Sequence, residues 1–159
     1  MAGQIARPGP AHKGVTMQDP DALRLRYQQE NISASEFADI LNRSGLGARR
    51  PVEDLPRLQR MLDGATLLLT ARDARSGTLL GVARALTDHA YACYLSDLAV
   101  DAAYQGHGIG RALLEMTRQL AGEDSMCLLL AAPDAVGFYE KLSMPHAQHA
   151  FIFPRKTKS

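Results

Sequence analysis

Cysteine is scarce in this chain of 159 residues, which has only Cys93 and Cys127. Both lie within apolar runs, and they are not spaced as a C-x-x-C pair. Because free cysteine is among the residue types most often buried, this placement predicts two buried thiols rather than a disulfide or a zinc site. We therefore expect a protein without a metal site.

An excess of charge of one sign and long apolar runs are also missing. The chain has 18 Lys and Arg against 17 Asp and Glu, a formal net charge of +1, so it lacks the overall positive field that attracts nucleic acid or anionic membranes. Its apolar runs are far shorter than the roughly 20 residues that span a bilayer, and residues 1–14 lack the apolar segment of a secretory signal. We expect a cytoplasmic protein that binds neither nucleic acid nor membrane.

The composition is otherwise that of an ordinary globular domain, with 46% apolar and 22% charged residues. Residues 1–19 are rich in Gly, Pro and Ala and show no period, which predicts a flexible N-terminal extension. The remaining length is typical of one domain. We place this domain at residues 20–154, followed by a short basic tail at 155–159.

Hydrophobic periodicity predicts an α/β order of elements. Strand patterns occur, in chain order, at residues 22–28, 65–71, 78–86, 91–100 and 126–131, with a last apolar stretch at 150–153. Ser33 and Asp54 are placed to cap two helices that lie between the first two strands. A third helix begins near Ile109, and a fourth begins at Pro133. The helix that connects the last two long strands favours a parallel pairing between them.

The most informative segment is a glycine-rich turn between a strand and a helix, with the sequence Gln105-Gly106-His107-Gly108-Ile109-Gly110-Arg111. Glycines let the backbone approach an anion, and the N–H groups and dipole of a helix N-terminus bind phosphate. The nucleotide triphosphatase motif is excluded, because it requires Gly-Lys-Ser or Gly-Lys-Thr and Gly110 is followed by Arg111. The dinucleotide motif fits weakly, because it needs a third glycine where Arg111 stands. A phosphate-bearing ligand is the direct interpretation.

The spelling Gln105-x-x-Gly108-x-Gly110 resembles the acetyl-CoA pyrophosphate loop of the GNAT (Gcn5-related) N-acetyltransferase superfamily. "YLSDLAVDAAYQGHGIGRALL" is similar to the fourth strand and third helix of that family, and "AVGFYEKLSM" is similar to its later helix, with Ser143 and Met144 in place of the usual Gly-Phe. "SGLGARRP", "LTDHAY" and "YQGHGIGRALLE" resemble small bacterial members related to plastid arylalkylamine (serotonin) N-acetyltransferases. The resemblance covers residues 21–153. It implies a single-domain α/β fold whose mixed central sheet splays between strands 4 and 5, with helices on both faces and a final strand at 150–153.

The resemblance also implies roles for individual residues, with acetyl-CoA as co-substrate. The pantetheine arm would lie beside Leu98, Ala99 and Val100, and the backbone N–H of Leu98 would face the thioester carbonyl. The pyrophosphate would lie on Gln105, Gly106, His107, Gly108, Ile109, Gly110 and Arg111. Tyr139 matches the tyrosine that many members use as the general acid for the departing thiolate.

The proton acceptor is less clear from the sequence. Ser96 stands where polyamine acetyltransferases of the superfamily have a glutamate, so that carboxylate is missing. Asp97 is the first candidate and Tyr94 the second. Regular strand alternation sends Asp97 to the face opposite Ser96 and Tyr94, and only a bulge in the strand would change this parity. A structural Asp97 is the competing interpretation.

We therefore expect an enzyme that transfers the acetyl group of acetyl-CoA to a primary amine, with a small-molecule arylalkylamine as the leading acceptor. A protein lysine or N-terminal amine is the alternative substrate, and a non-catalytic acyl-CoA-binding regulator is the alternative class. Few acidic residues lie near the expected site, which disfavours a polycationic polyamine. The sequence leaves a homodimer open.

Overall fold

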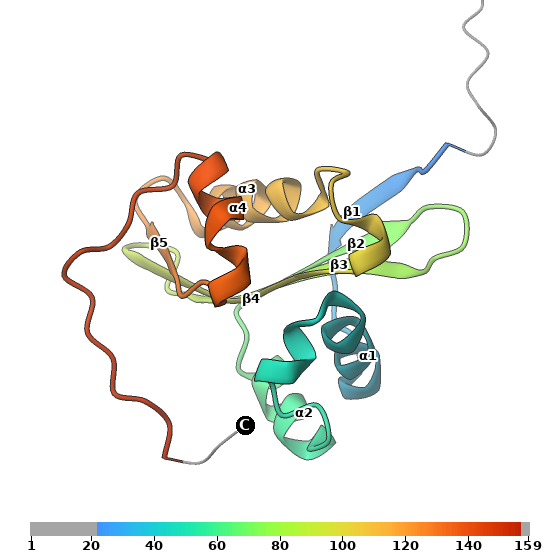
Figure 1. Cartoon of the computed structure of the whole chain (residues 1–159), viewed down its shortest axis with the longest axis horizontal. Helices are drawn as coiled ribbons and strands as arrows, with labels where there is room; N and C mark the ends of the chain where they lie inside the picture. Colours follow the sequence, from blue (N-terminus) through green and yellow to red (C-terminus); the bar gives the residue numbers. More distant parts are fainter. Residues whose placement is uncertain (1–21, 157–159) are drawn as a thin grey trace, which may run out of the picture.

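A five-stranded mixed sheet with helices on both faces organises the chain (Figure 1). The computed structural model describes residues 22–156. The strands lie in the order β1-β2-β3-β4-β5, with the first four antiparallel and β5 parallel to β4. Their bounds are β1 (Leu25–Gln29), β2 (Leu67–Asp73), β3 (Leu79–Thr87), β4 (Ala92–Val100) and β5 (Met126–Leu129). The predicted fold class is confirmed, whereas the expected extension at residues 1–19 lies outside the described part.

Two helices cover one face of the sheet, α1 (Ala34–Ser44) and α2 (Leu55–Asp63). The Ser33 hydroxyl accepts a hydrogen bond from the Glu36 N–H, and the Asp54 carboxylate accepts one from the Arg57 N–H. These bonds satisfy N–H groups that lack an intrahelical partner, so each helix begins where its cap predicts. Their apolar sides form a core with the face of the sheet that they cover.

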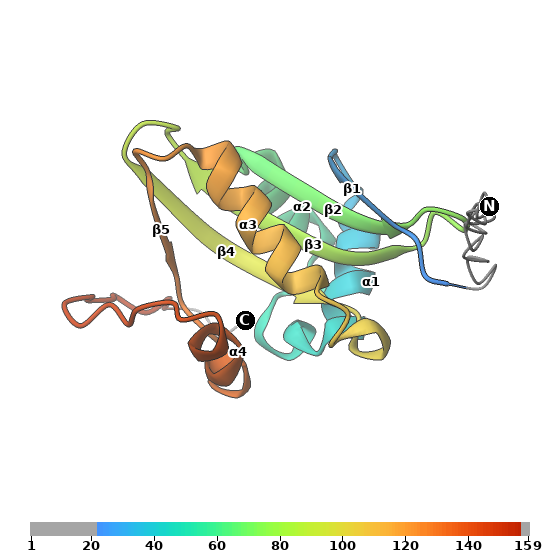
Figure 2. The ribbon, with the colours of Figure 1, turned by 90° about the horizontal axis from the view of Figure 1, so that it is seen from above.

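The opposite face is covered by α3 (Ile109–Ala121), and α4 (Val136–Lys141) lies on the same side, beyond the end of β5 (Figures 1 and 2). Ile109 and Leu113 of α3 are fully buried against β2, β3 and β4. Three short 3₁₀ turns connect elements around the site, at Leu46–Arg49, Ala102–Tyr104 and Pro133–Ala135. No helix in the described range 22–156 has the length and apolar character that a membrane span requires.

The sheet splays between β4 and β5, as the family resemblance implies. Residues 92–95 of β4 pair with residues 126–129 of β5, and the rest of β4 has no partner on that side within the described residues. Figure 2 shows the two strands diverging, with α4 beyond the end of β5. One edge of the second half of β4 is therefore open to a ligand.

The expected last strand at residues 150–153 is absent, and this prediction is wrong. The segment after α4 has no strand, and its side chains Phe151 and Phe153 are fully exposed. The four apolar residues 150–153 are followed at once by Pro154, which cannot donate a ladder hydrogen bond, and they pair with no strand in the described part of the chain. The segment instead crosses below the sheet toward α2 (Figure 1).

Candidate active site

Strand β4 contains a β-bulge at Ser96. Odd-numbered residues face α3 before the bulge, and even-numbered residues face α3 after it. Arg84 of β3 pairs with Asp97, and the next residue Ala85 pairs with Leu95, so Ser96 is the extra residue. Before the bulge Leu95 packs in the core under α3, and after it Leu98 does so. Asp97 consequently faces the α1 and α2 side, as Tyr94 does. The bulge that the parity argument required is present.

The backbone of the second half of β4 is directed into the splay. The Asp101 N–H donates to the Leu80 carbonyl on β3. Because backbone groups alternate along an antiparallel strand, the N–H of Leu98 points away from β3, into the gap between β4 and β5. This N–H is available to a bound carbonyl group.

The glycine-rich turn before α3 has a backbone conformation that requires glycine at two positions. Gly106 and Gly108 have φ angles of 84° and 81°, in the left-handed region that other residues rarely adopt. Gly108 is the residue that caps α3, so the first N–H groups of this helix face outward from the turn. The turn thus leads into a helix N-terminus with outward-facing N–H groups, and the binding of an anion there stays a prediction.

Side chains of this turn mainly brace it. The Gln105 amide donates to the Val100 carbonyl over 3.2 Å, and Nδ1 of His107 lies 3.0 Å from the Tyr104 carbonyl oxygen. Arg111 forms an exposed ion pair with Glu115 at 2.9 Å, one turn along α3. These contacts hold the Gln105 and His107 side chains against the turn and the Arg111 side chain along α3.

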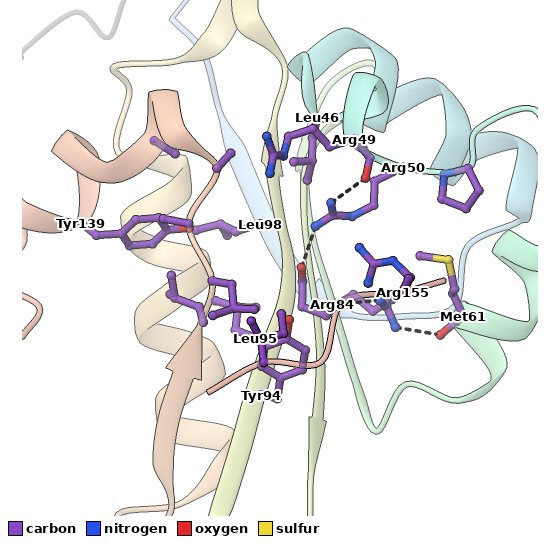
Figure 3. A pocket seen from close by; sticks show the side chains of 18 of the residues that line it. Leu46, Arg49, Arg50, Met61, Arg84, Tyr94, Leu95, Leu98, Tyr139 and Arg155 are labelled. Atoms are coloured by element: carbon purple, nitrogen blue, oxygen red, sulfur yellow. Dashed lines mark hydrogen bonds between the residues drawn. The ribbon is translucent and has the colours of Figure 1, made fainter. Parts of the chain in front are cut away.

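Two cavities meet at the splay. A cavity of about 680 Å³, here called the loop groove, runs from the glycine-rich turn along residues 98–100 of β4 to Phe138. A second cavity of about 420 Å³, here called the arginine cavity, lies between the first half of β4, α2, the end of β5 and the C-terminal segment (Figure 3). Six residues line both: Leu46, Arg49, Leu98, Ala132, Ala135 and Tyr139. A ligand in one cavity therefore reaches a ligand in the other beside Leu98 and Tyr139.

Tyr139 lies on α4, across the junction from β4 (Figure 3). Its ring packs edge to face against Phe138, with 5.0 Å between ring centroids. Burial raises the pKa of the Tyr139 phenol, and the nearby Cys127 thiol raises it further. The phenol consequently keeps its proton at neutral pH, as a proton donor must.

Asp97 is held between two arginines beneath the arginine cavity. Arg50 Nε donates to one carboxylate oxygen and Arg84 Nε to the other. The Asp97 side chain is 0% exposed, against 8% for Arg84 and 18% for Arg50. Arg50 also binds the Ser96 carbonyl, and Arg84 binds the Ser96 hydroxyl, so the network fixes the bulge. With both oxygens engaged, Asp97 is placed to position the arginines, while Tyr94 faces the cavity directly.

Sequence reasoning did not find the five arginines that line the arginine cavity, which are Arg49, Arg50, Arg57, Arg84 and Arg155. One usable signal was Arg84, a charged residue inside the otherwise apolar run 78–86. A second signal was the adjacent pair Arg49 and Arg50, which closely follows the glycines Gly45 and Gly47. The remaining two, Arg57 and Arg155, lie far apart in the chain and gave no signal.

The two cysteines are free thiols on neighbouring strands, with Cys93 of β4 in register with Cys127 of β5. Cys93 is buried as predicted, whereas Cys127 is half-buried because β5 is an edge strand. Burial, followed by the neighbouring Cys93, raises the pKa of the Cys127 thiol to about 11. Among the described residues no group of three His, Cys, Asp or Glu side chains is arranged to hold a metal ion.

The fold and the site define a class of α/β proteins with a splayed mixed sheet and a glycine-rich turn at the N-terminus of the helix that follows the fourth strand. A family model described as "Acetyltransferase (GNAT) domain" matches residues 64–142. This range contains the splay, the turn and Tyr139. The chain belongs to the GNAT superfamily.

Sequence relatives agree with this assignment. "GCN5-related N-acetyltransferase 2, chloroplastic" of Arabidopsis thaliana is 42% identical over 66 residues, which are 40% of this chain and 26% of that protein. "Uncharacterized N-acetyltransferase ycf52" of Pyropia yezoensis is 30% identical over 115 residues, which are 71% of this chain and 65% of that protein. The chain thus spans about a quarter of the first relative and just under two thirds of the second.

A solved structure with the same fold is that of the aminoglycoside N-acetyltransferase AAC(6')-Iy in complex with CoA. The alignment has a TM-score of 0.66 and covers 88% of this chain and all of that one. Identity is 14%, so the likeness is one of fold.

Proposed function

We propose that this protein is an acetyl-CoA-dependent N-acetyltransferase that acetylates the primary amine of a small molecule. The observation that carries the proposal is the meeting of the loop groove and the arginine cavity beside Leu98 and Tyr139. A thioester that ends at this junction would be within reach of an amine that enters from the other side. Placing two reactants together in this way supplies much of the rate enhancement of a bimolecular transfer.

The loop groove would hold acetyl-CoA. The pyrophosphate would lie on the backbone of residues 105–111, where Gly106 and Gly108 leave the N–H groups accessible. The pantetheine arm would extend along Leu98, Ala99 and Val100 in the position of an added strand. The open edge of β4 and the match to the GNAT domain support this placement.

The chemistry follows from the groups at the junction. The neutral amine attacks the thioester carbonyl carbon, and the Leu98 N–H stabilises the oxyanion that develops. Collapse of the tetrahedral intermediate breaks the C–S bond, and Tyr139 gives its proton to the departing thiolate. The proton that the amine loses passes to Tyr94 or to water. Asp97 does not accept this proton directly, because both of its oxygens accept hydrogen bonds from Arg50 and Arg84; its role is to position these arginines.

For the acceptor we propose a small arylalkylamine, the class that the family resemblance indicates. The volume of the arginine cavity, about 420 Å³, suits a small molecule better than a folded protein segment. Met61, Tyr94 and Leu129 line this cavity and provide apolar surface for an aryl group. A lysine-rich peptide is disfavoured by the arginine lining.

The test is a thiol-release assay with acetyl-CoA and a panel of amines, together with the variant Tyr139→Phe. We expect the variant to bind CoA normally and to lose about 10² to 10⁴ in kcat, the usual contribution of general acid catalysis. Tyr91→Phe is the matched control, since Tyr91 is 77% exposed and lies outside both cavities. If CoA binds and no amine or peptide releases the thiol, the protein is an acyl-CoA-binding regulator and the proposal is wrong.

A further inference from the structure

The arginine cavity has an unusual charge for a site that would receive an amine. Five arginines line it: Arg49, Arg50, Arg57, Arg84 and Arg155. No Asp or Glu is among the lining residues in the described part of the chain. Figure 3 shows the side chains of Arg49, Arg50, Arg84 and Arg155 on the β4 and α2 side of the cavity, with Tyr139 opposite them. They come from three segments: the stretch after α1, strand β3 and the C-terminal segment.

Among the residues that the structure describes, one carboxylate offsets these charges. Asp97 lies beneath the cavity and is shared by Arg50 and Arg84. The guanidinium groups of Arg49, Arg57 and Arg155 form no ion pair within 4.0 Å among residues 22–156. Five positive groups against one negative group leave an excess of four charges on a cavity of about 420 Å³. An ammonium ion that enters this cavity alone is repelled.

A ligand with a negative group resolves this imbalance. Guanidinium groups bind carboxylate and phosphate through paired, charge-assisted hydrogen bonds, and unpaired arginines in a cavity are the usual recognition elements for such groups. The same positive charges favour the neutral, nucleophilic form of a nearby amine, because like charge disfavours its protonation. An acceptor that carries both an acid group and an amine is therefore suited to the cavity in two ways.

We infer, on the basis of the proposed function, that the acceptor is a small amine that carries a carboxylate or phosphate group, bound by Arg57 and Arg155. These two arginines line the arginine cavity and not the loop groove, so they are placed to touch the acceptor and not CoA. Arg49 lines both cavities and is assigned to neither ligand. The inference gives the C-terminal segment a function, because Arg155 belongs to the stretch that forms no strand.

Matched acceptor pairs test the inference. Phenylalanine and phenethylamine differ only in the carboxylate, and phosphoethanolamine and ethanolamine differ only in the phosphate. We expect kcat/KM to favour at least one acidic member by about tenfold or more, the size of a charge-assisted hydrogen bond. Which pair shows the larger preference distinguishes carboxylate from phosphate.

Variants assign the preference to the two arginines. Arg57→Gln and Arg155→Gln should each reduce the preference for the acidic member about tenfold through KM, and leave KM for acetyl-CoA unchanged. Arg60→Gln and Lys156→Gln are matched controls, since both residues are exposed neighbours that line neither cavity. Loss of turnover on both members alike in the Arg57 and Arg155 variants would overturn the inference. So would a wild-type enzyme that uses the plain amines equally well or better.

A binding measurement separates this inference from the proposed function. 3-Phenylpropanoate and ethyl phosphate carry the acid group but no amine, so calorimetry with these probes reports the anion site without any acetyl transfer. Binding that weakens about tenfold in Arg57→Gln and Arg155→Gln, with no turnover of any amine, would leave the anion site standing and refute the acetyltransferase. Turnover of plain amines, with no binding of either probe, would do the reverse.

Discussion

Replacement of Asp97 by asparagine separates the two roles considered for this residue. The change removes one negative charge from between two arginines while keeping the shape of the side chain. Because Asp97 is 0% exposed and Arg84 only 8%, the positive charges left behind cannot be fully hydrated. Breaking a buried ion pair from one side costs about 3 to 5 kcal/mol, and the lower figure applies here because the asparagine carbonyl still accepts one hydrogen bond. For a chain of this length, about 3 kcal/mol corresponds to a Tm lower by about 6 to 12 °C.

The assay combines thermal unfolding with the pH profile of kcat/KM. Asp39→Asn is the control, because Asp39 also pairs with an arginine but is 61% exposed, and such surface pairs contribute less than about 1 kcal/mol. We expect a large drop in Tm for Asp97→Asn only, with an acidic limb of the profile that stays in place. An unchanged Tm together with a loss of about 10² to 10⁴ in kcat would refute this reasoning and make Asp97 the proton acceptor.

Three further predictions follow from the backbone and the thiols. Gly108→Ala and Gly77→Ala each place a side chain at a positive φ angle, 81° and 75° respectively, so each should lower the free energy of unfolding by about 1 to 2 kcal/mol. Calorimetry should show weaker CoA binding for Gly108→Ala and unchanged binding for Gly77→Ala. Ser143, at φ 57°, stands where the family usually has glycine, so Ser143→Gly should raise Tm by about 2 to 4 °C, and an unchanged Tm would show that the turn is unstrained. With its pKa raised to about 11, Cys127 should react with a thiol reagent at pH 9 about 50-fold more slowly in the native than in the unfolded protein, whereas equal rates would show an unperturbed thiol.

Features that depend on neighbouring residues could be predicted from the sequence. Ser33 and Asp54 cap their helices through N–H groups three residues away, and Gly106 and Gly108 provide the backbone angles of the turn at their own positions. Tyr139 could be placed because a family pattern surrounds it. Each of these signals is local in the chain.

Features that depend on distant contacts could not be predicted. Arg50 and Arg84 reach Asp97 across 47 and 13 positions of the chain, and no local pattern marks that network. The bulge at Ser96 is a property of two strands together, because it exists only in the register of β4 against β3. The expected last strand was wrong for a similar reason. An apolar stretch such as 150–153 forms a strand only where it pairs with another strand, and such pairing depends on distant contacts.

Because Ser96 is an extra residue, the alternation of side chains between the two faces of the sheet shifts by one position within β4. Tyr94, before it, lines the cavity proposed for the acceptor, and residues 98–100, after it, form the edge proposed for the cofactor. Deletion of Ser96 would restore regular alternation, with Leu95 still on the α3 side and Asp97 on the opposite side, but it would remove the Ser96 carbonyl and hydroxyl that Arg50 and Arg84 bind. The extra residue therefore serves the two arginines: its carbonyl and hydroxyl give them acceptors that a regular strand would not offer at this position.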